Sequence, residues 1–392
     1  MLTDRSFAFP PMPAELFDRL ARVPCEEKFI LENKALGIAE IGLGRCHGKS
    51  SAKTFCARSF DAEYTYSLSP RWEISLRADG VCIRRHFDTG EALTPEQCER
   101  ELQNLLEATP EADAESMPEI PAPSEIGGDW YPASARKLID AIHAGELKKI
   151  VLARSIESRT ASPIPAAPIL RKLRERFGRN CTIFAITRNG KTFLGATPET
   201  LVRLRNGLVE TEALAGSVPN APDADLAERC RRFIEDDKER REHRAVVDFI
   251  AEKLSRMGLS PEFPETPEVA VLPNILHLRT PISARACAPI HVLDLVSALH
   301  PTPAMCGVPA DRAREKILST EPFARGHFAG PLGFYDASGE GFFAVGIRCA
   351  EIDGGTIRLF AGSGLVAGSV PEREFAEIDN KFSALLTSIA KS

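Results

Sequence analysis

Residues 182–211 read TIFAITRNGKTFLGATPETLVRLRNGLVET and decide the fold class. Short runs of apolar and β-branched residues alternate here with two Asn-Gly pairs, Asn189-Gly190 and Asn206-Gly207. An Asn-Gly pair between such runs is the strongest short-range signal of a β-hairpin, because both residues tolerate the positive φ angles of a tight turn. The pattern therefore predicts one antiparallel set of strands, at 182–187, 191–195, 201–204 and 208–211.

Hairpin signals and long helices continue outside this stretch. A second hairpin series runs from Gly326 to Ala361. A long charged helix is expected over about 224–257, with a break near Asp236, and a final helix over about 370–391. Consecutive hairpins with helices outside them indicate large antiparallel or mixed sheets covered by helices. The sequence therefore predicts an α+β fold.

One stretch differs in composition from the rest of the chain. Residues 108–132, ATPEADAESMPEIPAPSEIGGDWYP, are rich in Pro, Ala and Glu and poor in large apolar residues, as in a surface loop. The stretch separates an N-terminal part, 1–107, from a C-terminal part, 133–392, which carries most of the motifs.

The composition fits a soluble enzyme and excludes several other classes. Lys and Arg total 49 against 55 Asp and Glu, and the resulting net charge of −6 disfavours a nucleic-acid partner. No apolar run approaches the roughly 18 residues of a membrane span, and no secretory leader is recognisable. The ten cysteines include no C-x-x-C pair, which favours free thiols in a reducing compartment. We therefore expect a cytoplasmic protein without a nucleic-acid or membrane partner.

Carboxylates occur in two pairs at helical spacing. Glu239 and Glu242 share one helix face, and Glu374 and Glu377 share another, with Lys381 four residues beyond Glu377. The two pairs could converge on one Mg²⁺ ion, which prefers oxygen ligands and completes its shell with water and substrate. Two solvated helix faces with i,i+3 and i,i+4 ion pairs explain the same spacing, and charge runs usually have that meaning.

A glycine-rich segment offers a candidate anion site. Gly362-Ser363-Gly364 follows the expected strand 356–361, and its N–H groups could form a nest for a carboxylate. Arg348, on the preceding strand, could add a bidentate contact to the same anion. A strand-end turn beside a surface arginine is an equally simple reading.

The motifs, taken in order, resemble those of a known family. They are Lys149-Ile-Val-Leu-Ala-Arg154, Gly195-Ala-Thr-Pro-Glu-Thr200, Glu212-Ala-Leu-Ala-Gly-Ser217, Asp236-x-Lys-Glu-x-x-Glu-His243, His300-Pro-Thr-Pro-Ala-Met-Cys-Gly307, Arg325-Gly-His-Phe-Ala-Gly330, Ile347-Arg-Cys349, Phe360-Ala-Gly-Ser-Gly-Leu365 and Glu374-x-x-Glu-x-x-x-Lys381. This order is similar to that of the chorismate-utilising enzymes, over roughly residues 130–390. The resemblance implies that 1–392 is one unit of two large sheets with helices packed outside and the active site in a cleft between the sheets.

The resemblance also implies site residues and a cofactor. Glu242 and Glu377 would bind Mg²⁺ with support from Glu239 and Glu374, and the metal would hold the ring carboxylate of chorismate. Arg348 and the backbone at Gly362, Ser363 and Gly364 would hold the enolpyruvyl carboxylate. The remaining expected cleft residues are Gly216, Ser217, His277, Ala304, Phe328, Ile347 and Lys381, of which His277, Ala304, Phe328 and Ile347 would shape the ring pocket.

The reaction of such an enzyme demands one base and one acid at opposite ends of the ring. Water adds at C2 while the C4 hydroxyl leaves. Lys149 fits the base if it is neutral for part of the time, and Glu199 fits an acid that burial keeps protonated. Without the resemblance, Lys149 would be a strand-edge lysine and Glu199 a turn residue after Pro198.

The resemblance implies the branch that uses water. In those members the base lysine lies directly before the apolar strand, as Lys149 does here, and members supplied with ammonia usually pair with or are fused to a glutaminase, for which this chain has no room. In salicylate synthases, threonine and tyrosine are typical where this chain has Ala304 and Phe328. We therefore expect isochorismate synthesis, for catecholate siderophores built on 2,3-dihydroxybenzoate, by a monomer without a glutaminase subunit. The alternatives are a salicylate synthase, and a non-catalytic chorismate-binding subunit, which should have lost some of these residues.

Overall fold

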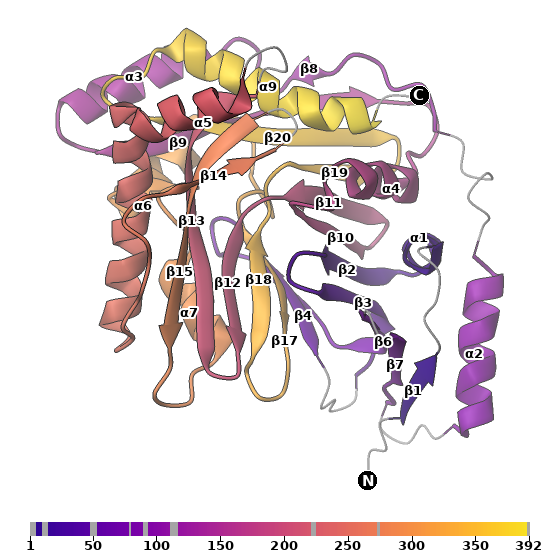
Figure 1. Cartoon of the computed structure of the whole chain (residues 1–392). Helices are drawn as coiled ribbons and strands as arrows, with labels where there is room; N and C mark the ends of the chain where they lie inside the picture. The colour runs from indigo at the N-terminus through magenta and orange to yellow at the C-terminus, as the bar shows by residue number, and fades with distance from the viewer. Residues whose placement is uncertain are drawn as a thin grey trace.

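Two antiparallel sheets form the framework of the chain (Figure 1). The computed structural model describes residues 5–9, 15–47, 53–77, 80–88, 93–109, 117–220, 225–272 and 275–389. Within them, the large sheet has twelve strands, ordered β1 (Arg5–Phe9), β7 (Gly80–Arg85), β6 (Pro70–Arg77), β3 (Ile38–Arg45), β2 (Glu27–Asn33), β10 (Thr182–Arg188), β11 (Lys191–Thr197), β19 (Cys349–Asp353), β20 (Thr356–Leu365), β9 (Lys149–Arg159) and β16 (Gly307–Val308), with β8 (Ser124–Glu125) also paired to β9. The small sheet has eight, ordered β14 (Glu268–Val271), β15 (Ile275–Arg285), β13 (Leu208–Pro219), β12 (Thr200–Arg205), β18 (Gly341–Val345), β17 (Pro331–Tyr335), β4 (Thr54–Arg58) and β5 (Thr65–Leu68).

Both expected Asn-Gly hairpins are present. Asn189 and Gly190 join β10 to β11, Asn206 and Gly207 join β12 to β13, and all four residues have positive φ angles. The two hairpins, however, lie in different sheets, so the prediction of one antiparallel set was wrong. Local turn chemistry fixes each hairpin, but the chain leaves the large sheet for the small one at Pro198, where the backbone lacks an N–H for a ladder.

The second hairpin series is divided in the same way. β17 and β18 belong to the small sheet, whereas β19 and β20 belong to the large one. The chain crosses back between Gly346 and Arg348, and Arg348 adopts a φ of +50° there. The two crossings are hydrogen-bonded to each other, because Val345 N–H donates to Glu199 O at 3.1 Å and Ala196 N–H donates to Arg348 O at 3.1 Å. Glu199 and Arg348 are thereby fixed where the two sheets meet.

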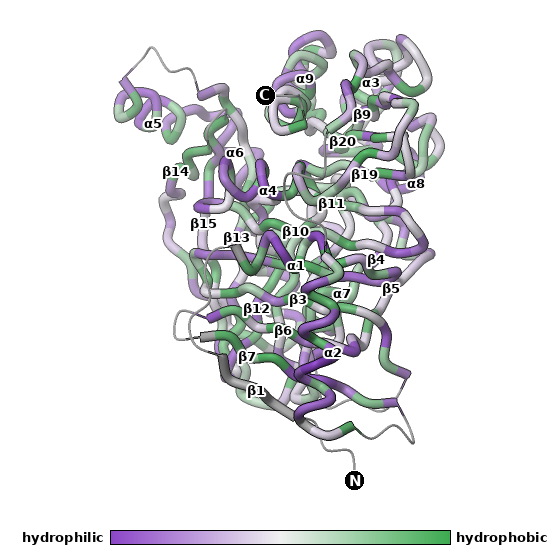
Figure 2. Tube along the Cα trace, turned by 90° about the vertical axis from the view of Figure 1, so that its right-hand side faces the viewer, coloured by the Kyte–Doolittle hydropathy of each residue, from purple (hydrophilic) through white to green (hydrophobic). Residues whose placement is uncertain are grey.

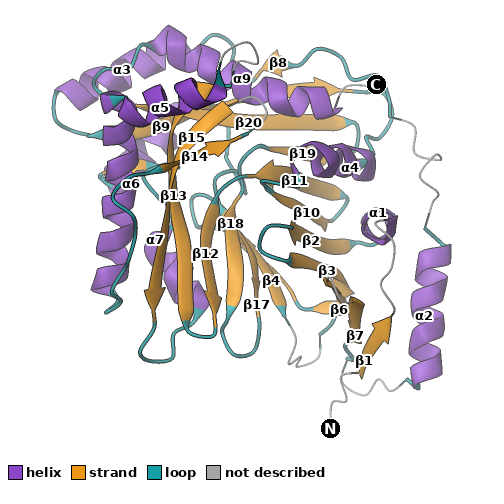
Figure 3. Ribbon diagram, viewed as in Figure 1, coloured by secondary structure: helices purple, strands orange, loops and turns teal. Residues whose placement is uncertain are grey.

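Helices lie outside both sheets, as expected (Figure 3). Within the described residues they are α1 (Glu15–Arg22), α2 (Pro95–Glu107), α3 (Tyr131–His143), α4 (Ala166–Phe177), α5 (Leu226–Glu235), α6 (Asp237–Arg256), α7 (Val292–Leu299), α8 (Ala310–Thr320) and α9 (Pro371–Ile389). α6 and α7 pack on the small sheet, and α4, α8 and α9 pack on the large sheet. The break near Asp236 is confirmed, because Asp236 ends α5 and its carboxylate accepts from Lys238 and Glu239 N–H at the start of α6.

The core lies between the two sheets and beneath the helices. The ring of Phe29, in the large sheet, packs at a tilt against that of Phe55, in the small sheet, with centroids 5.1 Å apart, and the Phe55 and Phe334 ring centroids lie 6.1 Å apart. Gly42 permits this approach, because a Cβ there would lie 2.7 Å from the Phe55 ring. Figure 2 shows hydrophobic residues recurring along the strands and hydrophilic residues on outer helices such as α2 and α5.

The segment 108–132 is irregular in its described part, apart from β8 and the start of α3, and residues 110–116 lie outside the described residues. Strands from before and after it share both sheets. That sharing supports one unit over 1–392, which stays a prediction. In the part of the chain described here, no helix combines the length and apolar character needed to cross a membrane.

Candidate active site

A cleft of about 820 Å³, including its open mouth, lies where the two sheets meet. Fourteen of the seventeen residues expected in the site line it, and they come from β9, β13, β15, β20, α6, α9, the two crossings between the sheets and the loops that follow α7 and α8. They are Lys149, Glu199, Gly216, Ser217, Glu242, His277, Ala304, Phe328, Ile347, Arg348, Gly362, Gly364, Glu377 and Lys381.

The other three, Ser363, Glu239 and Glu374, lie directly behind this lining. The Ser363 hydroxyl donates to the Glu374 carboxylate. The Glu239 carboxylate accepts from Ser217 N–H at 3.0 Å and pairs with Lys238 at 3.2 Å. These three residues therefore support the lining from behind.

Lys149 is the first residue of β9, and its side chain is buried against α6. Its Nζ lies 2.7 Å from Glu242 Oε1. Burial would raise the pKa of Glu242, but Lys149, together with the Lys238 and Lys381 charges, more than offsets burial, so that pKa lies below its usual value. Gly364 makes room for the pair, because a Cβ there would lie 3.0 Å from both Glu242 Oε1 and Lys149 Cε.

Glu199 lies at the crossing from β11 to β12 and is buried. Burial, followed by the nearby Glu212 carboxylate, raises the pKa of its carboxyl group to about 8, although the Lys149 ammonium opposes the rise. Glu212 is held behind Glu199, since its Oε1 accepts from Thr200 N–H at 2.9 Å and its Oε2 accepts from Arg279 Nε at 2.5 Å. A carboxyl group with this pKa carries its proton at neutral pH, as a general acid requires.

Arg348 is linked to β13 through His277. Its Nη2 donates to His277 Nε2 at 2.8 Å. A neutral imidazole with Nε2 accepting carries its proton on Nδ1, which lies 3.1 Å from Gly216 O and 3.0 Å from Ser217 Oγ. Burial, together with the Arg348 and Lys381 charges, holds the pKa of His277 well below its usual value, so the ring stays neutral. His277 therefore orients Arg348 as well as lining the cleft.

The Gly362-Ser363-Gly364 segment does not form a strand-end nest. β20 continues through these residues, paired with β9 from Ala153 back to Val151, so that expectation was wrong. The pairing of β20 with β19, however, ends at Phe360. Backbone groups on the other edge of β20 beyond Phe360 therefore face the cleft, and Lys381 Nζ donates to one of them, Gly362 O, at 2.8 Å.

Glutamates of α6 and α9 act on the same ammonium. Burial opposes the charged form of Lys238, but Glu239, Glu374 and Glu242 raise its pKa, so carboxylates of both helices lie within electrostatic range of Lys238. Lys381 pairs with Glu377 at 2.7 Å. Among the described residues, no three His, Cys, Asp or Glu side chains are grouped as ligands of one ion.

The chemistry of these donors nevertheless fits Mg²⁺. Carboxylate oxygens are hard ligands, and Mg²⁺ needs few of them from the protein. The pKa values of Glu239 and Glu374 are raised, first by burial and next by the neighbouring Glu242 and Glu377 carboxylates respectively. A divalent cation would relieve this crowding of like charges.

Sequence reasoning missed three residues near the reacting groups. Glu212 and Lys238 lie within quoted motifs, but nothing in their spacing showed that they face Glu199 and the carboxylate pairs. Arg325 also lies within a quoted motif and lines the cleft. An arginine among apolar residues, Arg325 followed by Phe328 and Ala329, was the available signal.

Comparisons with known proteins identify relatives of this chain. The family described as chorismate binding enzyme matches residues 13–390. Isochorismate synthase DhbC of Bacillus subtilis (strain 168) is 37% identical over 278 residues, covering 69% of this chain and 69% of that protein. Isochorismate synthase MenF of Escherichia coli (strain K12) is 40% identical over 254 residues, covering 63% of this chain and 57% of that protein.

A solved structure extends the likeness to nearly the whole chain. The menaquinone-specific isochorismate synthase MenF from Escherichia coli has a TM-score of 0.88 at 27% identity, over 99% of this chain and 95% of that one. The two-sheet architecture is therefore confirmed. The chain belongs to the family of chorismate-binding enzymes.

Proposed function

We propose that this chain catalyses the Mg²⁺-dependent, reversible conversion of chorismate into isochorismate. One observation carries the proposal: Lys149, at the start of β9, and Glu199, at the crossing between the sheets, are both buried and line the same cleft, where the pKa of Glu199 is raised to about 8. Water addition at C2 with loss of the C4 hydroxyl needs a base and an acid on separate parts of the ring. The identity of both curated relatives as isochorismate synthases supports the same reaction.

In the proposed mechanism, Lys149 takes a proton from the water that bonds to C2. The ring double bonds shift, the C4–O bond breaks, and Glu199 gives its proton to the departing hydroxyl, which leaves as water. The reverse reaction uses the same two groups in exchanged roles, so the enzyme should equilibrate the two isomers. Lys149 must first leave Glu242, to which its Nζ donates at 2.7 Å, and lose a proton to solvent, because an ammonium cannot accept the proton of the attacking water.

We assign the substrate carboxylates to two separate groups of residues. Arg348, the open edge of β20 at Gly362–Gly364 and Lys381 would bind the enolpyruvyl carboxylate. Glu242 and Glu377, supported by Glu239 and Glu374, would hold Mg²⁺. When bound, the ion would neutralise and orient the ring carboxylate.

The ring pocket bears on the choice of product. Ala304, Phe328, Ile347 and His277 line the cleft beside Lys149. Ala304 and Phe328 supply no hydroxyl that could hold the enolpyruvyl group over the C2 hydrogen for loss of pyruvate. We therefore infer that isochorismate is released.

The cellular location, the oligomeric state and the pathway are also part of the proposal. We place it in the cytoplasm, because all ten cysteines are free thiols, as is usual in a reducing compartment. We infer a monomer without a glutaminase subunit that feeds 2,3-dihydroxybenzoate for a siderophore, a role that the resemblance implies. Likeness to the menaquinone-specific MenF supports the competing pathway, and loss of catecholate secretion on gene deletion would separate the two.

The direct test is incubation of the purified chain with chorismate and Mg²⁺, followed by separation of the products. Isochorismate should form, EDTA should stop its formation, and purified isochorismate should return chorismate. Lys149→Ala and Glu199→Gln should each lower kcat by roughly 10²–10⁴-fold while chorismate binding survives. Stoichiometric salicylate and pyruvate would identify a salicylate synthase, and chorismate binding without turnover would identify a non-catalytic subunit.

A further inference from the structure

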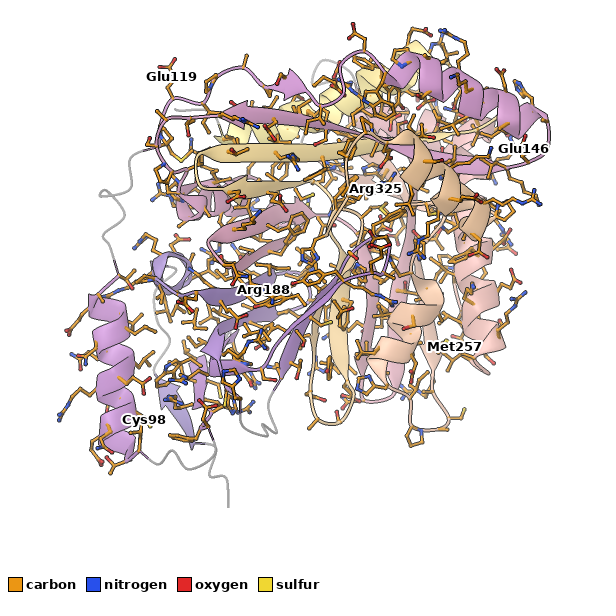
Figure 4. The ribbon with its side chains drawn as sticks, turned by 180° about the vertical axis from the view of Figure 1, so that it is seen from behind. Cys98, Glu119, Glu146, Arg188, Met257 and Arg325 are labelled. Atoms are coloured by element: carbon orange, nitrogen blue, oxygen red, sulfur yellow. The ribbon has the colours of Figure 1, made fainter. Side chains whose placement is uncertain are left out.

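A buried ion pair with no role in the mechanism above lies in the wall of the cleft. Arg325 Nη2 lies 2.5 Å from Glu321 Oε1, and Arg325 Nε donates to Glu321 Oε2 at 2.8 Å. Each side chain is only 2% exposed, and Arg325 lines the cleft. Figure 4 labels Arg325 near the junction of the two sheets. Because Glu321 compensates its charge, Arg325 is not a free cation for a substrate carboxylate.

Among the described residues, no strand pairs with this edge of β9 between β16 and β8, and the side chains of Arg325 and Glu321 form hydrogen bonds with it there. β16 pairs with only the first two residues of β9, and β8 pairs with β9 near its far end. Between them, Arg325 Nη2 donates to Val151 O at 2.8 Å, and Ala153 N–H donates to Glu321 Oε1 at 2.8 Å. The ion pair thus continues the hydrogen bonding of this sheet edge, two residues after Lys149, and fixes the position of β9.

The same guanidinium also holds the part of the ring pocket that carries Ala304 and Phe328. Arg325 Nη1 donates to Met305 O at 3.0 Å, which anchors the loop carrying Ala304. The Cζ atom lies 5.5 Å from the centre of the Phe328 ring and 4.3 Å from that of Phe60. A planar group with several donors can make these contacts at once, whereas a lysine ammonium cannot reproduce their geometry.

We propose that the Glu321–Arg325 pair is a positioning unit that sets the spacing between Lys149 and the Ala304–Phe328 wall, and that this spacing keeps isochorismate as the final product. The inference rests on the proposed function. The reaction that it suppresses moves the C2 hydrogen of isochorismate to the enolpyruvyl methylene carbon while the C3–O bond breaks. The products are salicylate and pyruvate, which together contain all the atoms of isochorismate, so the step needs no other reactant.

Arg325→Lys is the principal test, because it keeps the charge and removes the planar donor set. With chorismate and Mg²⁺, kcat should fall by about 10²-fold, as for other small misplacements of reacting groups. KM should stay within about threefold, since uniform substrate binding is untouched when the carboxylate contacts remain. The molar ratio of pyruvate to isochorismate should rise. Inactive or unfolded molecules do not alter this ratio, so loss of stability alone cannot produce the result.

The chain offers a matched control in a similar pair outside the cleft lining. Arg174 donates from Nε and Nη2 to Glu32 at 2.7 and 3.0 Å, and its Cζ lies 4.3 Å from the Phe17 ring centre. Arg174→Lys should lower the Tm but leave kcat and the product ratio at wild-type values. A similar rise of the product ratio in both variants would overturn the inference.

Two further outcomes keep the test decisive. If Arg325→Lys does not fold, Glu321→Gln replaces it, because the amide keeps an oxygen for Ala153 N–H while losing the charged pair; the same rise in the ratio is expected. A folded variant of either kind with wild-type kcat and product ratio overturns the inference alone. A wild-type chain that makes no isochorismate rejects the proposed function and this inference together.

Discussion

Glu199, the proposed general acid, shows how the surroundings of a single residue set the pKa of its side chain. Its pKa of about 8 arises from burial first, next from the Glu212 carboxylate, and Lys149 opposes both. The native state therefore holds the proton more tightly than the unfolded chain, in which the pKa of the carboxyl group is near its ordinary value of 4.5. The stability associated with this proton is present at low pH and is lost as the pH rises toward 8.

The first prediction concerns the pH dependence of catalysis. In the forward direction, kcat/KM for chorismate should fall as the pH rises through about 8, because Glu199 ionises and cannot protonate the leaving hydroxyl. A pH profile of initial rates at saturating Mg²⁺ measures this alkaline limb. A profile that stays flat well above pH 8 would remove Glu199 from the role of general acid.

The second prediction is that the Glu212 carboxylate contributes to the raised pKa of Glu199. Glu212→Gln removes the carboxylate that raises the pKa of Glu199, so the alkaline limb should move to lower pH. The same profile measures the shift. Glu210→Gln is the matched control, because Glu210 lies on the same strand and pairs with Arg203 while 42% exposed; its profile should match the wild type. If kcat/KM falls at the same alkaline pH in the wild type and in Glu212→Gln, Glu212 does not raise the pKa of Glu199.

At the scale of elements, local patterns predicted most hairpins and helices but not their division between sheets. The Asn-Gly pairs fix each turn through residues that accept positive φ, and this information is contained in two residues. The crossing at Pro198–Glu199 depends on which distant strands complete each sheet, and no local pattern records that. The spacing of the glutamates did not distinguish a metal site from two solvated helix faces. Their proposed roles came from the family resemblance.

The third prediction concerns the cap of α6. Asp236→Ala removes the acceptor for Lys238 and Glu239 N–H, at 2.9 and 3.0 Å, and should cost about 0.5–2 kcal/mol of stability. Because this turn positions Glu239 and Glu242, the Mg²⁺ concentration giving half-maximal activity should also rise. Denaturant unfolding and Mg²⁺ titration measure the two effects.

A second cap serves as the control for this prediction. The Asp225 carboxylate accepts from Ala227 N–H at 2.9 Å at the start of α5, which carries none of the cleft carboxylates. Asp225→Ala should lose stability through the same chemistry without changing the Mg²⁺ requirement. Identical Mg²⁺ requirements in both variants would show that the cap of α6 has no part in placing its carboxylates.

For the whole molecule, the proposed metal would connect the two sheets. α6 packs on the small sheet and presents Glu242, whereas α9 packs on the large sheet and presents Glu377. Lys149 and Lys381 compensate these two carboxylates at 2.7 Å each. A cation shared by both helices would replace two separate ion pairs with one contact across the cleft.

This connection leads to the fourth prediction, which needs no measurement of activity. Mg²⁺ bound only by the folded chain should raise the free energy of unfolding by about 2.7 kcal/mol at one hundred times its dissociation constant. Thermal unfolding with and without Mg²⁺ measures the shift, which Glu242→Gln and Glu377→Gln should each reduce strongly. Glu372→Gln is the control on α9, because Glu372 is 63% exposed and pairs with Arg136 at the surface. Its shift should equal that of the wild type, and an equal shift in Glu377→Gln would place the cation outside this cleft.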